Sequence, residues 1–202
     1  MASAELPPSW THLWVQHTAL AREFAHEALT RRDGADAEAA VVVAKRLREH
    51  AVELGSRFGG GYVGEQLEAA LVALTNEYIG FVAATARPRT EPGRTANDRL
   101  VAFERTATAV ADALAESARR RHFDMTAYSS ENVAATVMRP FVATTLHATT
   151  EYALRHYGAS LAAHEQTLEH VVGVVGPFFE SLVAPASVTK LGVVQLLRSM
   201  PE

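Results

Sequence analysis

The sequence predicts an all-α protein, a single antiparallel bundle of about six main helices with a short helix at its C-terminal end. Three observations predict this fold class. Large apolar residues recur every three or four positions over long segments, as on the buried face of an amphipathic helix. No segment alternates polar and apolar residues over the length of a strand. The breaks between the periodic segments are short, as they are between antiparallel neighbours in a bundle.

Three helices are expected in the first half of the chain, residues 9–86. Ser9 follows two prolines, and this segment is expected to start the first helix. Gly34 follows a basic turn and ends that helix, because glycine readily adopts the left-handed conformation found after helix ends. Three consecutive glycines after Phe58 end the second helix. The expected ranges are about 9–33, 35–58 and 63–86.

Three more helices are expected in the second half, residues 97–183, beyond a linker at 87–95 that contains two prolines and one glycine. Pro140 is expected to kink or split the fifth helix and Pro177 to bend the sixth, because proline lacks the N–H that a helix interior needs. The expected ranges are about 97–121, 131–157 and 159–183. The inward face of the fifth helix mixes apolar and polar residues: Val133, Val137, Phe141, Thr145, Leu146, Thr149 and Tyr152.

We expect a single domain over residues 1–202, in which two related halves share one core. Neither half holds an obviously complete core of its own, which disfavours two separate domains. The C-terminal segment, residues 187–200, is amphipathic and is expected to form the short last helix. The residues expected in the core are Trp14, Leu20, Phe24, Leu47, Leu54, Leu71, Leu74, Val110, Leu114, Leu146, Val171 and Val175.

The composition excludes several classes of protein. With 48% apolar residues, most of the 202-residue chain is expected to be folded. The absence of cysteine excludes disulfides, thiolate metal sites and cysteine nucleophiles. A net charge of −4 argues against a dedicated nucleic-acid-binding protein.

The chain is expected to be soluble and intracellular. Its first ten residues have neither the basic nor the apolar region of a signal peptide. The longest apolar stretch, residues 171–184, is interrupted by Glu180 and is too short to cross a bilayer about 30 Å thick. The 17 arginines against 2 lysines indicate a GC-rich genome, such as that of a bacterium or a large DNA virus. For a viral source, a virion component is an option.

Several segments share a pattern with a known group of proteins. In the first half they are Leu13-Trp14-Val15-Gln16-His17, Val52-Glu53-Leu54-Gly55 and the loop 57–64 that leads into 67–79. In the second half they are 103–114, 138–149 and the pair His164-Glu165. Over most of residues 13–183 the chain thereby resembles uncharacterised, mostly bacterial helical-bundle proteins with two similar helix pairs and flanking helices. The resemblance implies a bundle, and it implies no activity, because none is established for that group.

The chain departs from this group at polar positions. His17 is kept, and Glu53 stands where an acid is expected. Five positions where the group has histidine, asparagine or aspartate carry other residues here: Tyr78, Thr106, Thr108, Thr145 and Leu168. The resemblance therefore implies that the apolar scaffold persists while most of any polar site is lost. This favours a structural or interaction role.

One loose cluster could bind a ligand. If they all face one cavity, five side chains from four predicted helices could hold a metal ion or a small anion: His17, His50, Glu53, Tyr78 and His164. His17 lies on the apolar face of its helix, where a histidine more often belongs to the core than to a metal site. A di-metal carboxylate centre is not expected, because bundles of that type need Glu-x-x-His twice. The chain has it once, at residues 23–26.

Other candidate motifs lack an essential part. Leu168 stands where the helix of a zinc protease that began at His164 would need its second histidine. The glycine-rich segment 59–64 follows no predicted strand and lacks the lysine of a phosphate-binding loop. The basic run at 119–122 is explained by its place at a helix C-terminus. No Gly-x-Ser-x-Gly is present. We therefore expect no catalytic residues and no cofactor.

Two functions are compatible with these observations. The favoured prediction is a non-enzymatic structural or protein-interaction bundle that forms a homodimer through residues 187–200. That segment supplies the apolar side chains for docking: Val188, Leu191, Val193, Val194, Leu196 and Leu197. Neither nucleic acid nor a membrane is an expected partner. The alternative is a small-ligand or metal-binding bundle that uses the five-residue cluster.

Overall fold

The structure, a computed structural model, describes residues 9–31, 34–59, 61–86, 96–120 and 128–183. These residues form helices and turns and include no strand, so the predicted all-α fold class is confirmed. The linker predicted at 87–95 and the helix predicted at 187–200 lie outside the described residues.

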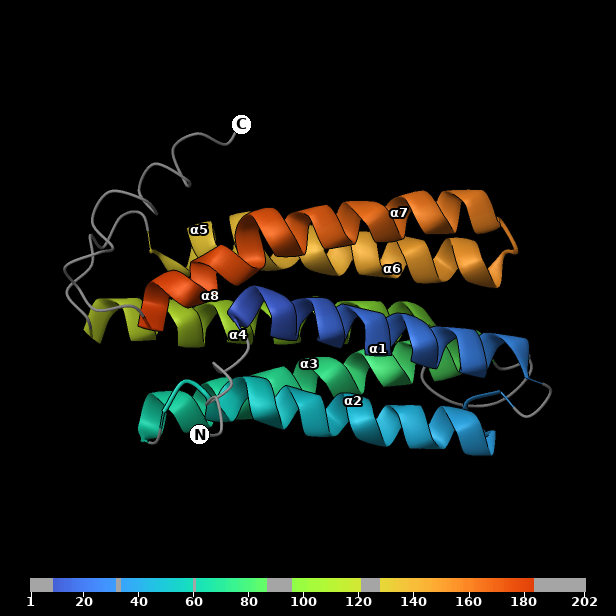
Figure 1. The fold of residues 1–202 in the computed structure, drawn as a ribbon, viewed down its shortest axis with the longest axis horizontal. Coiled ribbons are helices and arrows are strands. Elements are labelled where there is room, and N and C mark those ends of the chain that lie inside the picture. The colour runs from blue at the N-terminus through green and yellow to red at the C-terminus, as the bar shows by residue number, and fades with distance from the viewer. Residues whose placement is uncertain (1–8, 32–33, 60, 87–95, 121–127, 184–202) are drawn as a thin grey trace, which may run out of the picture.

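Six helical segments make up the bundle, and their ends agree with the predicted ends to within a few residues (Figure 1). The fifth and sixth segments are each divided by a π turn, Ala134–Met138 and Val171–Val175. The α-helices are α1 (Trp10–Thr30), α2 (Glu38–Ser56), α3 (Tyr62–Ala86), α4 (Ala96–Arg120), α5 (Ser130–Val133), α6 (Arg139–Ala153), α7 (Tyr157–His170) and α8 (Gly176–Val183).

Helix α1 occupies the centre of the bundle. In Figure 1 it lies between the pair α2 and α3 on one side and the pair α6 and α7 on the other, and it also contacts α8. Helix α4 packs along α3, and α6 packs along α7. Buried side chains from both halves of the chain form one continuous core. The similarity of the two halves stays a prediction.

Aromatic side chains pack around the N-terminal half of α1. The centroid of the fully buried Trp14 ring lies 5.3 Å from that of Phe141 and 5.2 Å from that of Phe179. The Trp10 ring lies 5.5 Å from Phe58 and 5.2 Å from Phe179. Aromatic pairs at such separations contribute about 0.5–1.5 kcal/mol each beyond the burial of their surface. This aromatic cluster joins α1 to α6, to α8 and to the end of α2.

The predicted core is confirmed except at one position. Every predicted core residue is buried apart from Leu20, which is only partly buried. Leu20 lies in a groove between α1 and α2, together with Arg46 and Glu49. Helical periodicity placed Leu20 on the inward face of α1. The groove keeps it partly exposed because the polar side of α2 lies opposite.

Each π turn precedes a proline. Pro140 follows the first turn and Pro177 follows the second. At the end of each turn a main-chain N–H donates to the carbonyl five residues earlier, from Arg139 to Ala134 and from Gly176 to Val171. Proline has no N–H to donate, and the wider π turn accommodates this missing hydrogen bond within the helix. The two π turns also contact each other. The helices therefore continue past both prolines.

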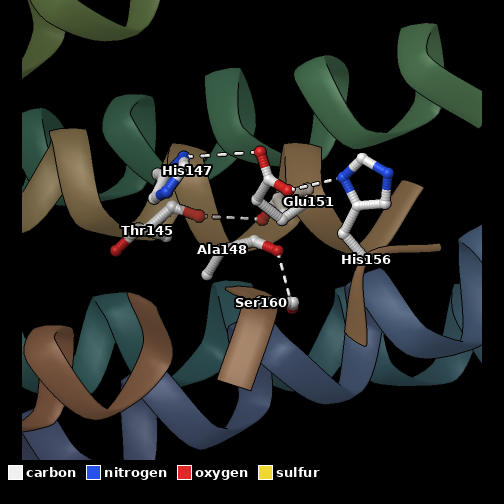
Figure 2. A network of polar contacts seen from close by, with 7 residues as sticks. Thr145, His147, Ala148, Glu151, His156 and Ser160 are labelled. Carbon is white, nitrogen blue, oxygen red and sulfur yellow. Dashed lines mark hydrogen bonds and ion pairs between the residues drawn. The ribbon is translucent and has the colours of Figure 1, made fainter. Parts of the chain in front are cut away.

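The turn between α6 and α7 is closed by a C-terminal capping motif. The N–H of His156 donates to the carbonyl of Glu151, and the N–H of Arg155 donates to that of Tyr152, both at 2.9 Å. This is the hydrogen-bond pattern of a Schellman motif, whose left-handed position is held here by Arg155 with a φ of 64°. Side chains reinforce the turn, since the Glu151 carboxylate lies 2.9 Å from His156 Nδ1 (Figure 2).

A second contact joins α6 and α7 further from the turn. The Ser160 hydroxyl donates to the carbonyl of Ala148 at 2.8 Å (Figure 2). On the outer side of α6, His147 Nδ1 lies 3.9 Å from the other oxygen of Glu151. These contacts hold α6 and α7 as one hairpin.

Helix α3 is long enough and apolar enough to cross a membrane, by length and composition alone. In the bundle, one of its faces is packed against neighbouring helices, and Leu67, Leu71, Leu74 and Tyr78 are buried there. The core helix of a soluble protein meets the same criterion. Helix α3 is therefore weak evidence for a membrane span.

Arg155→Gly is expected to stabilise the protein by about 0.5–1 kcal/mol, because glycine adopts the left-handed conformation without the steric cost that other residues carry. The measurement is the free energy of unfolding in urea. Arg155→Ala removes the same side chain but keeps a Cβ, so it should not show the gain. An equal gain in both variants would contradict the conformational explanation.

Candidate functional site

The structure divides the predicted five-residue cluster into two groups. His17 on α1 and His50 on α2 face each other, with ring centroids 5.6 Å apart. Glu53, one turn after His50, has an exposed side chain. Tyr78 and His164 instead line a cavity bounded by α1, α6 and α7. The five residues therefore do not face one cavity, because α1 stands between the two groups.

The His17 side chain is enclosed by the core. Its Nε2 atom lies 3.5 Å from Thr75 Oγ1, and its Nδ1 atom is buried without a hydrogen-bond partner among the described residues. Burial lowers the pKa of His17 to about 3, and the nearby His50 contributes to the shift. Burial also lowers the pKa of His50, while Glu53 opposes that shift. Both imidazoles are therefore neutral near pH 7.

The described part of the chain assembles no cluster of three His, Asp or Glu side chains that could hold a metal ion. His17 and His50 alone offer two nitrogen ligands, whereas protein zinc sites use three or four protein ligands. This pair packs between α1 and α2, with His17 buried and His50 partly buried beside the groove between these helices.

A cavity of about 410 Å³ opens between α1, α6 and α7. Tyr78 reaches it from α3. We call it the α1/α6/α7 cavity. Most of its lining side chains are small or polar: Thr18, Ala19, Ala21, Arg22, Glu23, Ala25, His26, Tyr78, Thr145, Ala148, Thr149, Tyr152, Ser160, His164 and Thr167.

The cavity exists because small residues stand where three helices would otherwise meet. Ala21 and Ala25 line it from α1, and Thr145 and Ala148 line it from α6. Helix α1 cannot collapse onto α6 to fill the space, because the Trp14 and Phe141 rings already pack against each other one turn away. The volume therefore remains open to a ligand or to solvent.

The threonine residues that line the cavity form its inner wall, and their hydroxyl groups donate hydrogen bonds to main-chain carbonyls. Four threonine hydroxyls of the wall donate to the carbonyl four residues earlier in their own helix, at 2.7–2.9 Å: Thr18, Thr145, Thr149 and Thr167. The Thr149 hydroxyl is also 3.0 Å from that of Tyr78, so the two protons of this pair are shared among three contacts within the protein. A hydroxyl has one proton and two lone pairs. The wall therefore offers methyl groups and oxygen lone pairs, and these hydroxyls have no proton left for a ligand.

The Tyr78 hydroxyl lies at the base of the cavity. It donates to the carbonyl of Ala21 at 3.1 Å and lies 3.0 Å from Thr149 Oγ1. Burial raises the pKa of Tyr78 to about 12, although the Thr149 hydrogen bond opposes the shift. Tyr78 is therefore neutral near pH 7 and cannot serve as a phenolate base or nucleophile there.

Polar groups gather around the outer part of the cavity. Arg22 and His26 are exposed on α1, and His164 is half-buried on α7. A ring nitrogen of His26 makes a hydrogen bond with the Tyr152 hydroxyl. Burial lowers the pKa of His164, and the positive charge of Arg22 lowers it further. Near pH 7 this edge therefore carries the charge of Arg22 beside a neutral imidazole.

Sequence reasoning identified Tyr78 and His164 but missed the other cavity residues. The available signal was the inward face of the fifth predicted helix, where Thr145, Thr149 and Tyr152 recur at helical spacing among apolar residues. Polar residues on an inward face indicate either hydrogen bonds within the core or a lined cavity. Arg22 gave no such signal, because an arginine on a helix surface is ordinary.

His17→Leu is expected to make the protein less sensitive to acid. The pKa of His17 is about 3 in the folded protein, below the ordinary value of 6.5, so its contribution to stability is complete above pH 6.5 and is lost as the pH falls toward 3. Between pH 7 and pH 4 the wild type should lose roughly 3 kcal/mol more than the variant.

The measurement is the free energy of unfolding in urea at the two pH values. His12→Leu, which removes an exposed imidazole from the same helix, should leave the acid sensitivity unchanged. The same acid sensitivity in the wild type and in His17→Leu would contradict the burial of a neutral imidazole.

Comparisons with known protein families, curated proteins and solved structures found no match to the chain. The resemblance to uncharacterised bundle proteins therefore stays a prediction. What supports a function for this protein is the chemistry of its own side chains.

Proposed function

We propose that this protein is a helical bundle that binds a small molecule in the α1/α6/α7 cavity. The observation that carries the proposal is a volume of about 410 Å³ lined mostly by small and polar residues from four helices. Ligand sites commonly have volumes of about 300–1,000 Å³, with apolar walls and a few polar groups. The proposal keeps Tyr78 and His164 from the predicted cluster and omits His17, His50 and Glu53.

The cost of the cavity supports a binding role. Larger apolar residues at Ala21, Ala25 and Ala148 would bury more surface and stabilise the bundle, by about 0.8 kcal/mol for each added methylene group. A bundle selected for stability alone would fill this space. The N-terminal half of α1 is filled in that way, by Trp10 and Trp14.

A structural or protein-interaction role is the second candidate, and exposed apolar side chains favour it. Leu154 is 58% exposed, Tyr157 is 55% exposed and Leu161 is 44% exposed, all near the turn between α6 and α7. Such side chains gathered at one end of a hairpin suit a protein contact. A soluble, intracellular homodimer joined through residues 187–200 also remains a proposal, and that segment lies outside the described residues.

Ala148→Leu is expected to weaken binding of a neutral probe, 4-phenylbutanamide, because the larger side chain takes up cavity volume. In the wild type, titration of the probe should shift the methyl NMR signals of Ala25, Ala148 and Thr149. In Ala148→Leu the dissociation constant should rise by about ten-fold or more.

Ala162→Leu is the matched control, because Ala162 is exposed on α7 and does not line the cavity. It should bind the probe as the wild type does. Unchanged cavity methyl signals at saturating probe would refute small-molecule binding at this site. Equal affinity in the wild type and Ala148→Leu would place the binding elsewhere.

A further inference from the structure

We propose that the ligand of the α1/α6/α7 cavity is a small organic carboxylate with an apolar body, whose carboxylate group binds Arg22. The inference rests on the proposed function and names the class of ligand. Three features of the cavity carry it: an uncompensated positive charge at its edge, an inner wall without free hydroxyl protons, and a second donor beside the charge.

The first feature is the balance of charge around the cavity. Among the arginine, lysine, aspartate and glutamate residues in the described part of the chain, Arg22 and Glu23 line the cavity. Glu23 lines both this cavity and the groove between α1 and α2, and its carboxylate lies 3.8 Å from Arg46 of α2. Arg22 makes no hydrogen bond or ion pair with the described residues. The charge available to a ligand is therefore positive.

Two neighbouring carboxylates, one on α1 and one on α6, each have a closer partner than Arg22 among the described residues. Glu27 lies 2.9 Å from Arg31, one turn along α1. The Glu151 carboxylate lies 2.9 Å from His156 Nδ1, at the far end of α6. No described residue therefore occupies the guanidinium donors of Arg22, and a carboxylate matches their planar geometry with two parallel hydrogen bonds.

The second feature orients the ligand. The inner wall presents methyl groups and lone pairs, since the threonine hydroxyls donate to the main chain. The Tyr78 hydroxyl likewise donates to the carbonyl of Ala21. A carboxylate placed at this base would meet lone pairs and no donor, which is unfavourable for a buried anion. The carboxylate must therefore lie at the Arg22 edge, with the apolar body against the alanine and threonine methyl groups.

The third feature is His164, which faces the same edge from α7. Its half-buried ring makes no hydrogen bond with the described residues, and Arg22 is close enough to act on it electrostatically. A neutral imidazole has one N–H donor, which can meet the second oxygen of a carboxylate held by Arg22.

The charge and the size of the site favour a carboxylate over a phosphate. One fixed positive charge beside a neutral imidazole matches a monoanion. A phosphate monoester carries close to two negative charges near pH 7 and is bound through several donors, as in basic clusters and helix N-termini. The volume of about 410 Å³ lies at the small end of ligand sites, which limits the apolar body to a compact group.

The test compares three compounds that share one body: 4-phenylbutanoate, 4-phenylbutanamide and 4-phenylbutylamine. Each is titrated into the full chain near pH 7, and the methyl NMR signals of Ala25, Ala148 and Thr149 report binding. The carboxylate should bind about ten-fold more tightly than the amide, and the amine more weakly than both. Arg22→Gln should reduce the affinity for the carboxylate to that for the amide and leave the amide unaffected.

Arg48→Gln is the matched control, because Arg48 lies on α2 and hydrogen-bonds Asn76 away from the cavity. This variant should keep the preference for the carboxylate. Equal affinity of the carboxylate and the amide for the wild type, or an unchanged preference in Arg22→Gln, would overturn the carboxylate inference while ligand binding stands. Failure of all three compounds to shift the cavity signals would overturn the proposed function itself.

Discussion

The burial of α1 on several sides is the constraint on which the rest of this bundle depends. A helix at the centre must offer each neighbour a surface of the right size, and α1 contacts α2, α3, α6, α7 and α8. The first half of α1 contacts its neighbours through the large aromatic rings of Trp10 and Trp14, and Trp14 is fully buried. These contacts set the distance between α1 and the α6–α7 hairpin. Farther along α1 the distance to the α6–α7 hairpin remains, although the side chains of α1 that face the hairpin are small there.

The cavity follows from this change of side-chain size. Beyond Trp14, α1 presents Thr18, Ala21 and Ala25 toward a hairpin that is itself held by the Ser160 contact and the capped turn at Arg155. Neither partner can move in to fill the space without breaking the aromatic packing at one end or the turn at the other. A packed bundle thus acquires a lined cavity through its small residues, without an irregular backbone at that place.

The helices and most of the core could be predicted from the sequence, because helix ends and apolar periodicity are local properties. Ser9 caps α1 and accepts a hydrogen bond from the N–H of His12, as its position before the apolar pattern indicates. Leu20 shows the limit of that reasoning. The same periodicity placed it in the core, and the polar side of α2 left it partly exposed. Periodicity gives the direction of a side chain about its own helix axis, and the neighbour in that direction must come from elsewhere.

The sequence by itself determined the all-α class, the approximate helix ends and the predicted core residues other than Leu20. From the sequence, Tyr78 and His164 were also predicted to share one cluster with His17, His50 and Glu53. Only the tertiary structure decided that α1 separates these residues into two groups and that Arg22 belongs with His164. The physical reason is the helical twist. Thr18 follows His17 directly, yet a rotation of about 100° per residue points Thr18 into the cavity and His17 toward His50 and Thr75. Which helix stands on each side is settled by how the whole chain packs, and no local pattern contains that information.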